Sequence, residues 1–166
     1  MGTDPASGGR APQGKTCAAS RVSIAQLMTP QYANNHGNVH GGWIMKLVDE
    51  AGALACMKHA AQRVVTVAVD QMTFDRPILI GDLVTLMAEV SYVGRSSMEA
   101  QVLVIAENPI SGHQTHTNTA YLVYVALDDA GHPVPVPPLT PETDAERHRF
   151  EQGRARQDYR RRSRNH

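Results

Sequence analysis

A polar, glycine-rich loop leads directly into a helical pattern over residues 34–59, which read NNHGNVHGGWIMKLVDEAGALACMKH. After the paired glycines Gly41 and Gly42, apolar side chains recur on one stripe when successive residues are spaced by about 100°. The members of this stripe are Ile44, Leu47, Val48, Ala51 and Ala55. The pattern therefore predicts an amphipathic helix from Trp43 to about His59 that packs through a single apolar face.

Extended segments surround this helix. One short strand is predicted before it, over residues 21–28, and the residues after it form alternating runs rich in β-branched and aromatic side chains. These four longer runs extend from Val64 to Phe74, Leu83 to Val93, Ser96 to Ala106 and Thr117 to Leu127. Because short turns join consecutive strands, the strands are expected to pair antiparallel. The order predicts an α+β domain in which one helix covers a half-open sheet, whose free edge and apolar area favour dimerisation.

The two ends of the chain differ in composition from this domain, which is assigned to residues 21–139. Residues 1–20 are rich in Gly, Pro and Ala, so ordering them would bury little surface and a flexible tail is expected. Residues 140–166 hold eight arginines and five acidic residues. They are predicted to form a charged C-terminal helix with Thr140 as its N-cap and Pro141 as its first residue. The mixed charges favour a solvated helix over a nucleic-acid contact.

Composition excludes several classes of protein. The longest apolar run has eight residues, from Ala120 to Leu127, whereas a membrane-spanning helix needs about 20. The N-terminal segment contains no apolar block typical of a secretory signal, so a cytoplasmic location without membrane or nucleic-acid partners is expected. The two cysteines, Cys17 and Cys56, are too few for a disulfide framework or a thiolate cluster. No GxGxxG, GxxxxGK[ST] or GxSxG motif is present, which removes the usual support for nucleotide binding or serine hydrolysis.

The loop-to-helix junction carries the candidate chemistry. Gly41 and Gly42 let the backbone approach a ligand closely and present unpaired N–H groups at the positive end of the helix dipole. Such groups stabilise a carbonyl oxygen that develops negative charge, although a tight turn explains the glycines equally well. Asp49 lies on a helix flank with small and apolar residues, away from the face that carries Lys46 and Glu50. A carboxylate in that position suits general-base chemistry, and a plain surface aspartate is the alternative.

Other polar residues carry weaker signals. His36 and His40 lie four residues apart in a loop, without the helical context or additional cysteines that a zinc site needs, so no metal is expected. The turn after Gly94 and Arg95 contains hydroxyls and a guanidinium that are able to bind phosphate, and ordinary turn chemistry explains them nearly as well.

Several ordered motifs closely resemble the hot-dog-fold acyl-CoA thioesterases, from about residue 21 to the C-terminal helix. The motifs are many and correctly spaced, so the resemblance is specific. They are NxxGNVHGG from Asn34, MKLVDEA from Met45, VTVAVD from Val65, FxxPI from Phe74, GD at Gly81, YVGRSSME from Tyr92 and PVPVP from Pro133.

This resemblance implies a long antiparallel sheet wrapped around the central helix, edge-to-edge homodimers and a hexamer formed by three dimers. Asp49 matches the family's catalytic acid, which activates water or attacks the thioester carbon. Asn34 matches a loop residue that acts with that acid from the opposing subunit, and the amide near Gly42 matches the group that polarises the thioester carbonyl. A segment that borders coenzyme A corresponds to Val93, Gly94, Arg95, Ser96 and Ser97.

The resemblance therefore implies hydrolysis of acyl-CoA to a free fatty acid and coenzyme A without a cofactor. Two alternatives remain open at this point. The first is a hot-dog acyl-thioester dehydratase or hydratase, in which His40 and Asp49 transfer protons. The second is a protein that binds acyl-CoA without turnover.

Overall fold

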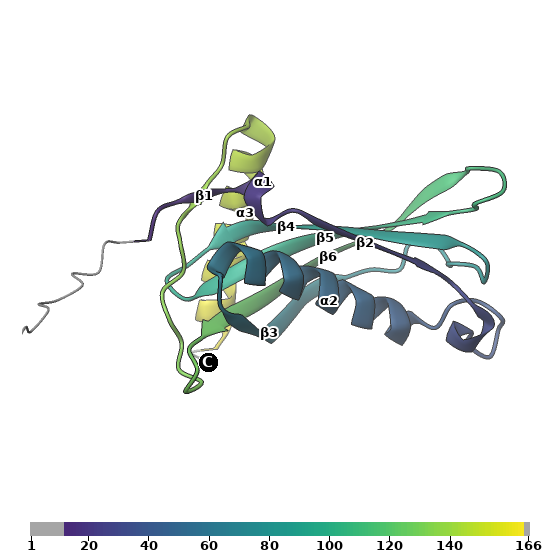
Figure 1. Cartoon of the computed structure of the whole chain (residues 1–166), viewed down its shortest axis with the longest axis horizontal. Coiled ribbons are helices and arrows are strands. Elements are labelled where there is room, and N and C mark those ends of the chain that lie inside the picture. Colours follow the sequence, from purple (N-terminus) through teal and green to yellow (C-terminus); the bar gives the residue numbers. More distant parts are fainter. Residues whose placement is uncertain (1–11, 165–166) are drawn as a thin grey trace, which may run out of the picture.

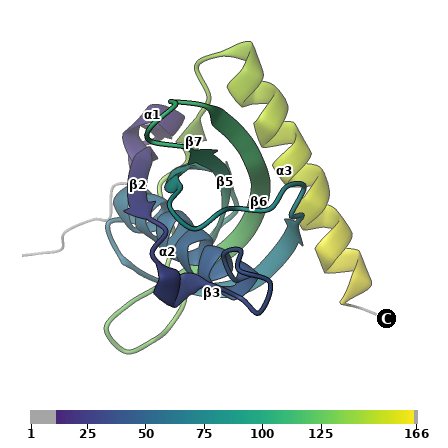
Figure 2. The same cartoon turned by 90° about the vertical axis from the view of Figure 1, so that its right-hand side faces the viewer.

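A curved antiparallel sheet holds one long helix on its concave side and another on its outside in the computed structural model, which describes residues 12–164 (Figure 1 and Figure 2). The helices and strands are β1 (Lys15–Thr16), α1 (Cys17–Ser20), β2 (Val22–Leu27), the 3-10 turn η1 (Pro30–Tyr32), α2 (Gly41–Ala60), β3 (Arg63–Met72), β4 (Leu83–Val93), β5 (Ser97–Glu107), β6 (Gln114–Leu127), β7 (Leu139–Thr140) and α3 (Asp144–Ser163). The predicted fold class, one helix wrapped by antiparallel strands, is confirmed.

The five long strands pair in the order β2-β4-β5-β6-β3, and every neighbouring pair is antiparallel. Side chains of a strand alternate between its two faces, and the inward set of β4, β5 and β6 meets the apolar stripe of α2. All five residues of the predicted helical stripe are buried. Burial of this stripe against the concave face of the sheet is the main apolar contact that holds α2 there.

The central helix begins two residues earlier than the apolar pattern predicts, at Gly41, because His40 caps it. The His40 side chain accepts the N–H of Gly42, which satisfies one of the free donors of the first turn. The helix ends at Ala60, and the next residue, Ala61, caps it in a left-handed conformation with φ of 53° and donates its N–H to the carbonyl of Met57.

The expectation of a flexible tail over residues 1–20 is wrong for Lys15–Ser20, while residues 1–11 lie outside the described part of the chain. Strand β1 pairs in parallel with β7, and α1 follows it immediately. Cys17 is only 2% exposed, and burial raises the pKa of its thiol to about 11. The Ser20 hydroxyl donates to the Cys17 carbonyl and accepts the N–H of Val90. The small side chains of α1 therefore pack against β4, although this segment contains no bulky apolar residue.

The C-terminal helix also differs from its prediction. It begins at Asp144, and its N-cap is Thr143, whereas Thr140 belongs to β7. The reason is a capping box: the hydroxyl of Thr143 accepts the N–H of Glu146, whose carboxylate accepts the N–H of Thr143 in return. Pro141 therefore precedes the helix.

The expected solvated helix is exposed over most of its residues, but one face of α3 packs on the outside of the sheet (Figure 2). Gly153 is buried there, and a Cβ atom at this position would lie 2.6 Å from Cβ of Tyr92. Three arginines of this helix form ion pairs with sheet residues: Arg149 with Glu89 at 2.6 Å, Arg156 with Glu99 at 2.7 Å, and Arg160 with Asp70.

None of the helices within residues 12–164 contains an apolar stretch of the length that a bilayer requires. Over the same range, no group of three or more His, Cys, Asp or Glu side chains is arranged to hold a metal ion.

Candidate active site

Asp49 lies midway along α2, is partly buried and points away from the ion pair that Lys46 forms with Glu50. Its Oδ1 atom accepts two hydrogen bonds, at 2.7 Å from the Thr66 hydroxyl and at 3.1 Å from the Tyr124 hydroxyl. No donor within residues 12–164 forms a hydrogen bond with Oδ2. The carboxylate of Asp49 is therefore held through one oxygen, and within the described residues the other oxygen has no hydrogen-bond donor.

Thr66 and Tyr124, the two donors, were not identified from the sequence as site residues. They lie directly opposite each other on β3 and β6, so both side chains face α2 and reach the same carboxylate oxygen. The one signal for Thr66 is a lone hydroxyl within the apolar run from Val64 to Val69. Tyr124 has no such signal, because a buried aromatic residue in a strand is an ordinary core residue.

The start of α2 departs from the expected arrangement at Gly42. Its N–H donates to Nδ1 of His40 at 2.9 Å, so this amide is already occupied. The N–H of the preceding residue, Gly41, has no acceptor within residues 12–164. The Phe74 ring lies beside it, 3.4 Å from the place where a Cβ atom of Gly41 would be. The free donor at the positive end of the helix is therefore Gly41.

Asn34 organises the loop that precedes α2. Its side-chain oxygen accepts the N–H of His36 at 2.8 Å and the N–H of Asn38 at 3.2 Å. Together with Gly41 and Phe74, it lines a hollow of about 330 Å³. No hydrogen bond joins Asn34 to the carboxylate on α2 in the described part of one protomer.

The predicted coenzyme A segment, Val93–Ser97, forms the turn between β4 and β5 at the far end of the sheet. Leu83, at the other end of β4, pairs with Leu27, which lies beside the loop that precedes α2. The first residues of β4 are therefore near the start of α2, and the turn that follows β4 is near the C-terminal end of α2. The Arg95 side chain is exposed, and the backbone carbonyl of Arg95 accepts the N–H of Val136. Since α2 has 20 residues, the turn and the helix start are separated by about 30 Å along the helix axis.

A single protomer therefore holds the predicted site residues in three separate places: the helix start, the middle of α2 and the β4–β5 turn. The structure brings Asn34 and the glycine pair together at the helix start, and it adds two hydroxyl donors to Asp49. Within one chain, however, neither Asn34 nor the glycine pair is brought to Asp49.

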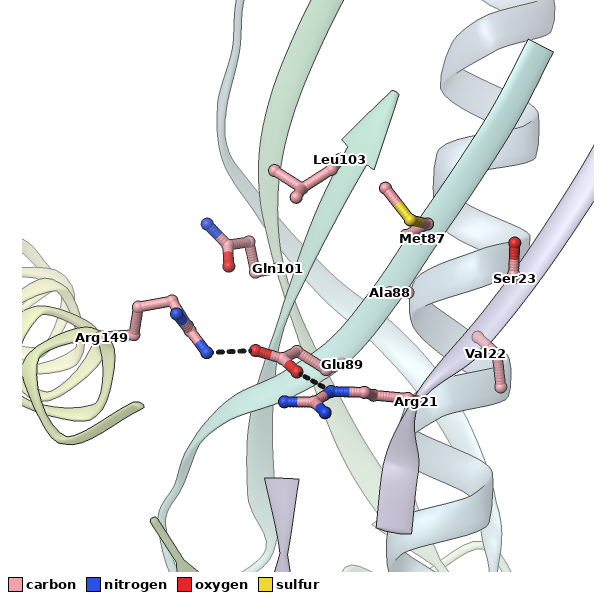
Figure 3. Close-up of a pocket in the computed structure, with 9 residues that line it drawn as sticks. All are labelled: Arg21, Val22, Ser23, Met87, Ala88, Glu89, Gln101, Leu103 and Arg149. Carbon is pink, nitrogen blue, oxygen red and sulfur yellow. Dashed lines mark hydrogen bonds and ion pairs between the residues drawn. The ribbon is translucent and has the colours of Figure 1, made fainter. Parts of the chain in front are cut away.

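The hollow drawn in Figure 3 lies on the outside of the sheet and has a volume of about 540 Å³. Its floor comes from β4 and β5, with Met87 and Leu103, and one wall comes from α3. Glu89 accepts hydrogen bonds from both Arg21 and Arg149, each at 2.6 Å. This hollow includes none of the predicted site residues, and the sheet separates it from Asp49.

Comparison with known proteins agrees with this architecture. The family model of the thioesterase superfamily matches residues 36–112. An uncharacterised acyl-CoA thioester hydrolase of Bacillus subtilis is 37% identical over 135 residues, which are 81% of this chain and 78% of that protein. The cytosolic acyl coenzyme A thioester hydrolase of Rattus norvegicus is 36% identical over 147 residues, or 87% of this chain. The chain spans about two fifths of the length of that mammalian relative, since the match covers 39% of it.

Two solved structures extend the likeness to the backbone. An acyl-CoA hydrolase from Staphylococcus aureus, in complex with butyryl coenzyme A, coenzyme A and coenzyme A disulfide, superposes with a TM-score of 0.83 at 35% identity over 90% of this chain and 92% of that one. An apo-hexameric acyl-CoA thioesterase gives a TM-score of 0.87 at 35% identity over 91% and 97% of the two chains. The chain therefore belongs to the hot-dog-fold thioesterase superfamily.

Proposed function

We propose that this chain is an acyl-CoA thioesterase, which hydrolyses acyl-CoA to a free fatty acid and coenzyme A. The observation that carries the proposal is the carboxylate of Asp49, held through Oδ1 by Thr66 and Tyr124 with Oδ2 free to act. The similar proteins support the substrate class, because they are named acyl-CoA thioester hydrolases. The reaction needs water and the residues of the site, and no cofactor is assigned.

The spacing of three residues supports their place in the site. Variants of the Staphylococcus aureus acyl-CoA hydrolase carry alanine in place of one asparagine, one aspartate and one threonine, separated by 15 and then 17 residues. In this chain Asn34, Asp49 and Thr66 are separated by the same 15 and 17 residues. The agreement supports our proposal that Thr66 belongs to the site, beside the two residues expected from the sequence.

The proposed roles follow from the contacts. Asp49 either activates a water molecule through Oδ2 or attacks the thioester carbon with it, and Thr66 holds the other oxygen. The thioester carbonyl oxygen binds at the helix start, where backbone N–H groups stabilise developing negative charge. Gly41 is the donor assigned to this role, because the N–H of Gly42 is occupied by His40.

A complete site requires a second copy of the chain. Strand β3 lies at the edge of the sheet, and its side chains Val65, Val67 and Val69 are 44–53% exposed. Pairing of two such edges would join two sheets, and Asn34 of one protomer would then act with Asp49 of the other. Hexameric relatives support a homo-oligomer, and we assign a hexamer of three dimers.

The β4–β5 turn is assigned to coenzyme A. Val93, Gly94, Arg95, Ser96 and Ser97 form this segment, and Arg95 is the exposed cation in it. Its guanidinium suits the phosphates of the ligand. A cytoplasmic location agrees with the relatives that are named cytosolic.

The dehydratase alternative lacks support in the geometry of one chain. The His40 ring caps Gly42, and nine residues separate His40 from Asp49, which is about 13 Å along a helix. The two side chains are thus not paired for proton transfer within a protomer.

The test is a thiol-release assay on the purified protein with acyl-CoA substrates of increasing chain length. Release of coenzyme A together with free fatty acid is expected, and enoyl-CoA should lose its thiol without being hydrated first. Binding of acyl-CoA without release would favour the silent binding protein. Hydration of enoyl-CoA without thiol release would favour the hydratase.

Shared sites are tested by mixing two inactive chains. Asn34→Ala and Asp49→Ala are co-expressed, and each heterodimer then contains one site with both native residues. With random pairing about one quarter of the sites should regain activity, whereas the two variants purified separately stay inactive. Absence of any recovery in mixed oligomers would mean that Asn34 and Asp49 do not act across the dimer.

A further inference from the structure

Tyr124 reaches α2 from β6, and its hydroxyl bonds to Asp49. Its side chain is completely buried and is the largest among the fully buried residues. The hydroxyl donates toward two acceptors of the same residue, the backbone carbonyl of Asp49 at 2.9 Å and the carboxylate Oδ1 at 3.1 Å. One hydroxyl therefore ties the main chain and the side chain of Asp49 to the sheet.

Gly52 makes this approach possible. It lies on α2 one turn after Asp49 and is buried. A Cβ atom at this position would lie 2.4 Å from the Tyr124 hydroxyl oxygen and 3.0 Å from ring carbon Cζ. Glycine in a helix interior is less favourable than alanine. The less favourable residue thus stands at the position where the Tyr124 hydroxyl contacts the helix.

We infer that Tyr124, admitted by Gly52, is a positioning residue for the acyl-CoA hydrolysis proposed above, and that it fixes the orientation of the Asp49 carboxylate. Tilting the carboxylate out of this orientation would break the hydrogen bonds from both Tyr124 and Thr66, so these two donors hold one oxygen and keep the other unbonded in a fixed direction. The inference rests on the proposed function, because it requires Asp49 to be the acting group.

The chemistry of the two donors suits this role. Burial, followed by the negative charge of Asp49, raises the pKa of Tyr124, so the hydroxyl stays protonated and keeps donating. Neither Tyr124 nor Thr66 carries a positive charge. A neutral donor orients the carboxylate without forming the ion pair that would occupy it.

Tyr124→Phe removes only the hydroxyl, and it is compared with Tyr121→Phe. Tyr121 lies on the same strand but faces outward, where its hydroxyl accepts a hydrogen bond from Gln101 at 3.0 Å. For Tyr124→Phe we expect kcat for thiol release to fall by about tenfold while KM changes by less than about twofold. For Tyr121→Phe both constants should stay at the wild-type value. Melting temperatures of both variants, recorded in parallel, separate a loss of positioning from a loss of folded protein.

A second substitution tests the contact between Tyr124 and Gly52. Gly52→Ala should lower kcat in the wild-type background, because its Cβ displaces the Tyr124 hydroxyl. In the Tyr124→Phe background the same change meets only ring carbons, at 3.0 Å and beyond, and should cost much less. The two effects should therefore be strongly non-additive in a double-mutant cycle.

The outcomes separate this inference from the function on which it rests. Wild-type protein and Asp49→Ala are measured in the same assay. If the wild type releases thiol, Asp49→Ala does not, and Tyr124→Phe equals the wild type or raises KM alone, the inference is wrong and the function stands. Additive effects of Gly52→Ala and Tyr124→Phe would also overturn it. If the wild type releases no thiol from any acyl-CoA, the proposed function fails and this inference fails with it.

Discussion

A carboxylate lies at each face of the sheet, and the two differ in their hydrogen-bond donors. On the inner face, Asp49 is partly buried, accepts hydrogen bonds from two neutral hydroxyls and keeps one oxygen free. On the outer face, Glu99 has no exposed side-chain surface, and both of its oxygens are bonded to Arg156, at 3.0 and 2.7 Å. The Ser91 hydroxyl also donates to Glu99 Oε1, at 2.8 Å.

This difference shows how the surroundings of a carboxylate decide its use. A guanidinium that binds both oxygens neutralises the charge and leaves no site for a substrate. Removing one partner of such a buried pair is costly, because the other charge stays buried. Neutral donors on a single oxygen preserve the negative charge and an open position. We therefore expect Asp49 to serve chemistry and Glu99 to serve stability.

Asp49→Ala is expected to lower kcat by ~10²–10⁴ with little change in KM, since the group acts in the transition state. Stability should change little, because the alanine keeps the backbone carbonyl that Tyr124 also contacts. Steady-state kinetics and a melting curve on the same preparation measure both effects. Thiol release equal to that of the parent protein would contradict the assignment of Asp49.

Glu99→Ala is expected to have the reverse profile. It leaves Arg156 without its partner and should lower the free energy of unfolding by about 3–5 kcal/mol, measured by denaturant titration. Glu151→Ala is the matched control, because Glu151 is exposed and pairs with Arg154 on the surface of α3. That change should cost less than about 1 kcal/mol. Equal stability of the two variants would mean that the outer-face pair does not hold α3 to the sheet.

Thr66→Val removes one donor from Asp49 at nearly constant shape. We expect kcat to fall by about tenfold, because a hydrogen bond to a charged group contributes about 1.5–3 kcal/mol. Thr66→Ser retains the hydroxyl and should recover most of the activity. A serine variant as slow as the valine variant would indicate that the methyl group matters and the hydroxyl does not.

Arg95→Ala tests the part of the proposed site that lies farthest from Asp49. We expect KM for acyl-CoA to rise several-fold at low ionic strength and less at high ionic strength, where the phosphates are screened. The value of kcat should stay close to that of the wild type. A KM that does not depend on salt in either protein would remove Arg95 from coenzyme A binding.

The smallest expected effect concerns His59, which is fully buried at the end of α2. Burial lowers its pKa below the ordinary 6.5, against the opposing effect of the contact between Nε2 and the carbonyl of Pro137. The unfolded chain therefore binds a proton at a higher pH than the folded chain, and stability falls as the pH drops through about 6.5. Denaturant titrations at about pH 7.5 and about pH 5.5 should show a smaller difference for His59→Gln than for the parent. An unchanged difference would mean that another group causes the pH dependence.

Local patterns predicted the elements of the inner face well. The stripe that begins at Ile44 located the helix, and the alternating runs located β4 and β5 to within one residue at each end. They succeeded because a residue that packs inward must recur with the period of its element. The position of Asp49 away from Lys46 follows from the same helical period.

The outer face was predicted less well for a related reason. Arginines on a helix resemble a solvated surface until their partners are known, and Glu99 is one polar residue within an apolar strand. The contact between Arg156 and Glu99 joins residues 57 positions apart. The buried Cys17 was likewise assigned to a tail, because its packing against β4 depends on contacts far along the chain.

The sequence by itself determined the central helix and the long strands, the position of Asp49 on the helix and, through the ordered motifs, the family. Only the tertiary structure decided which groups surround that carboxylate. It placed Thr66 opposite Tyr124, so that two hydroxyls meet one oxygen, and it assigned the free amide to Gly41 because His40 caps its neighbour. The physical reason is that helical and strand periods are local properties of the chain. The partners of a polar atom are set by strand register and by packing between distant segments.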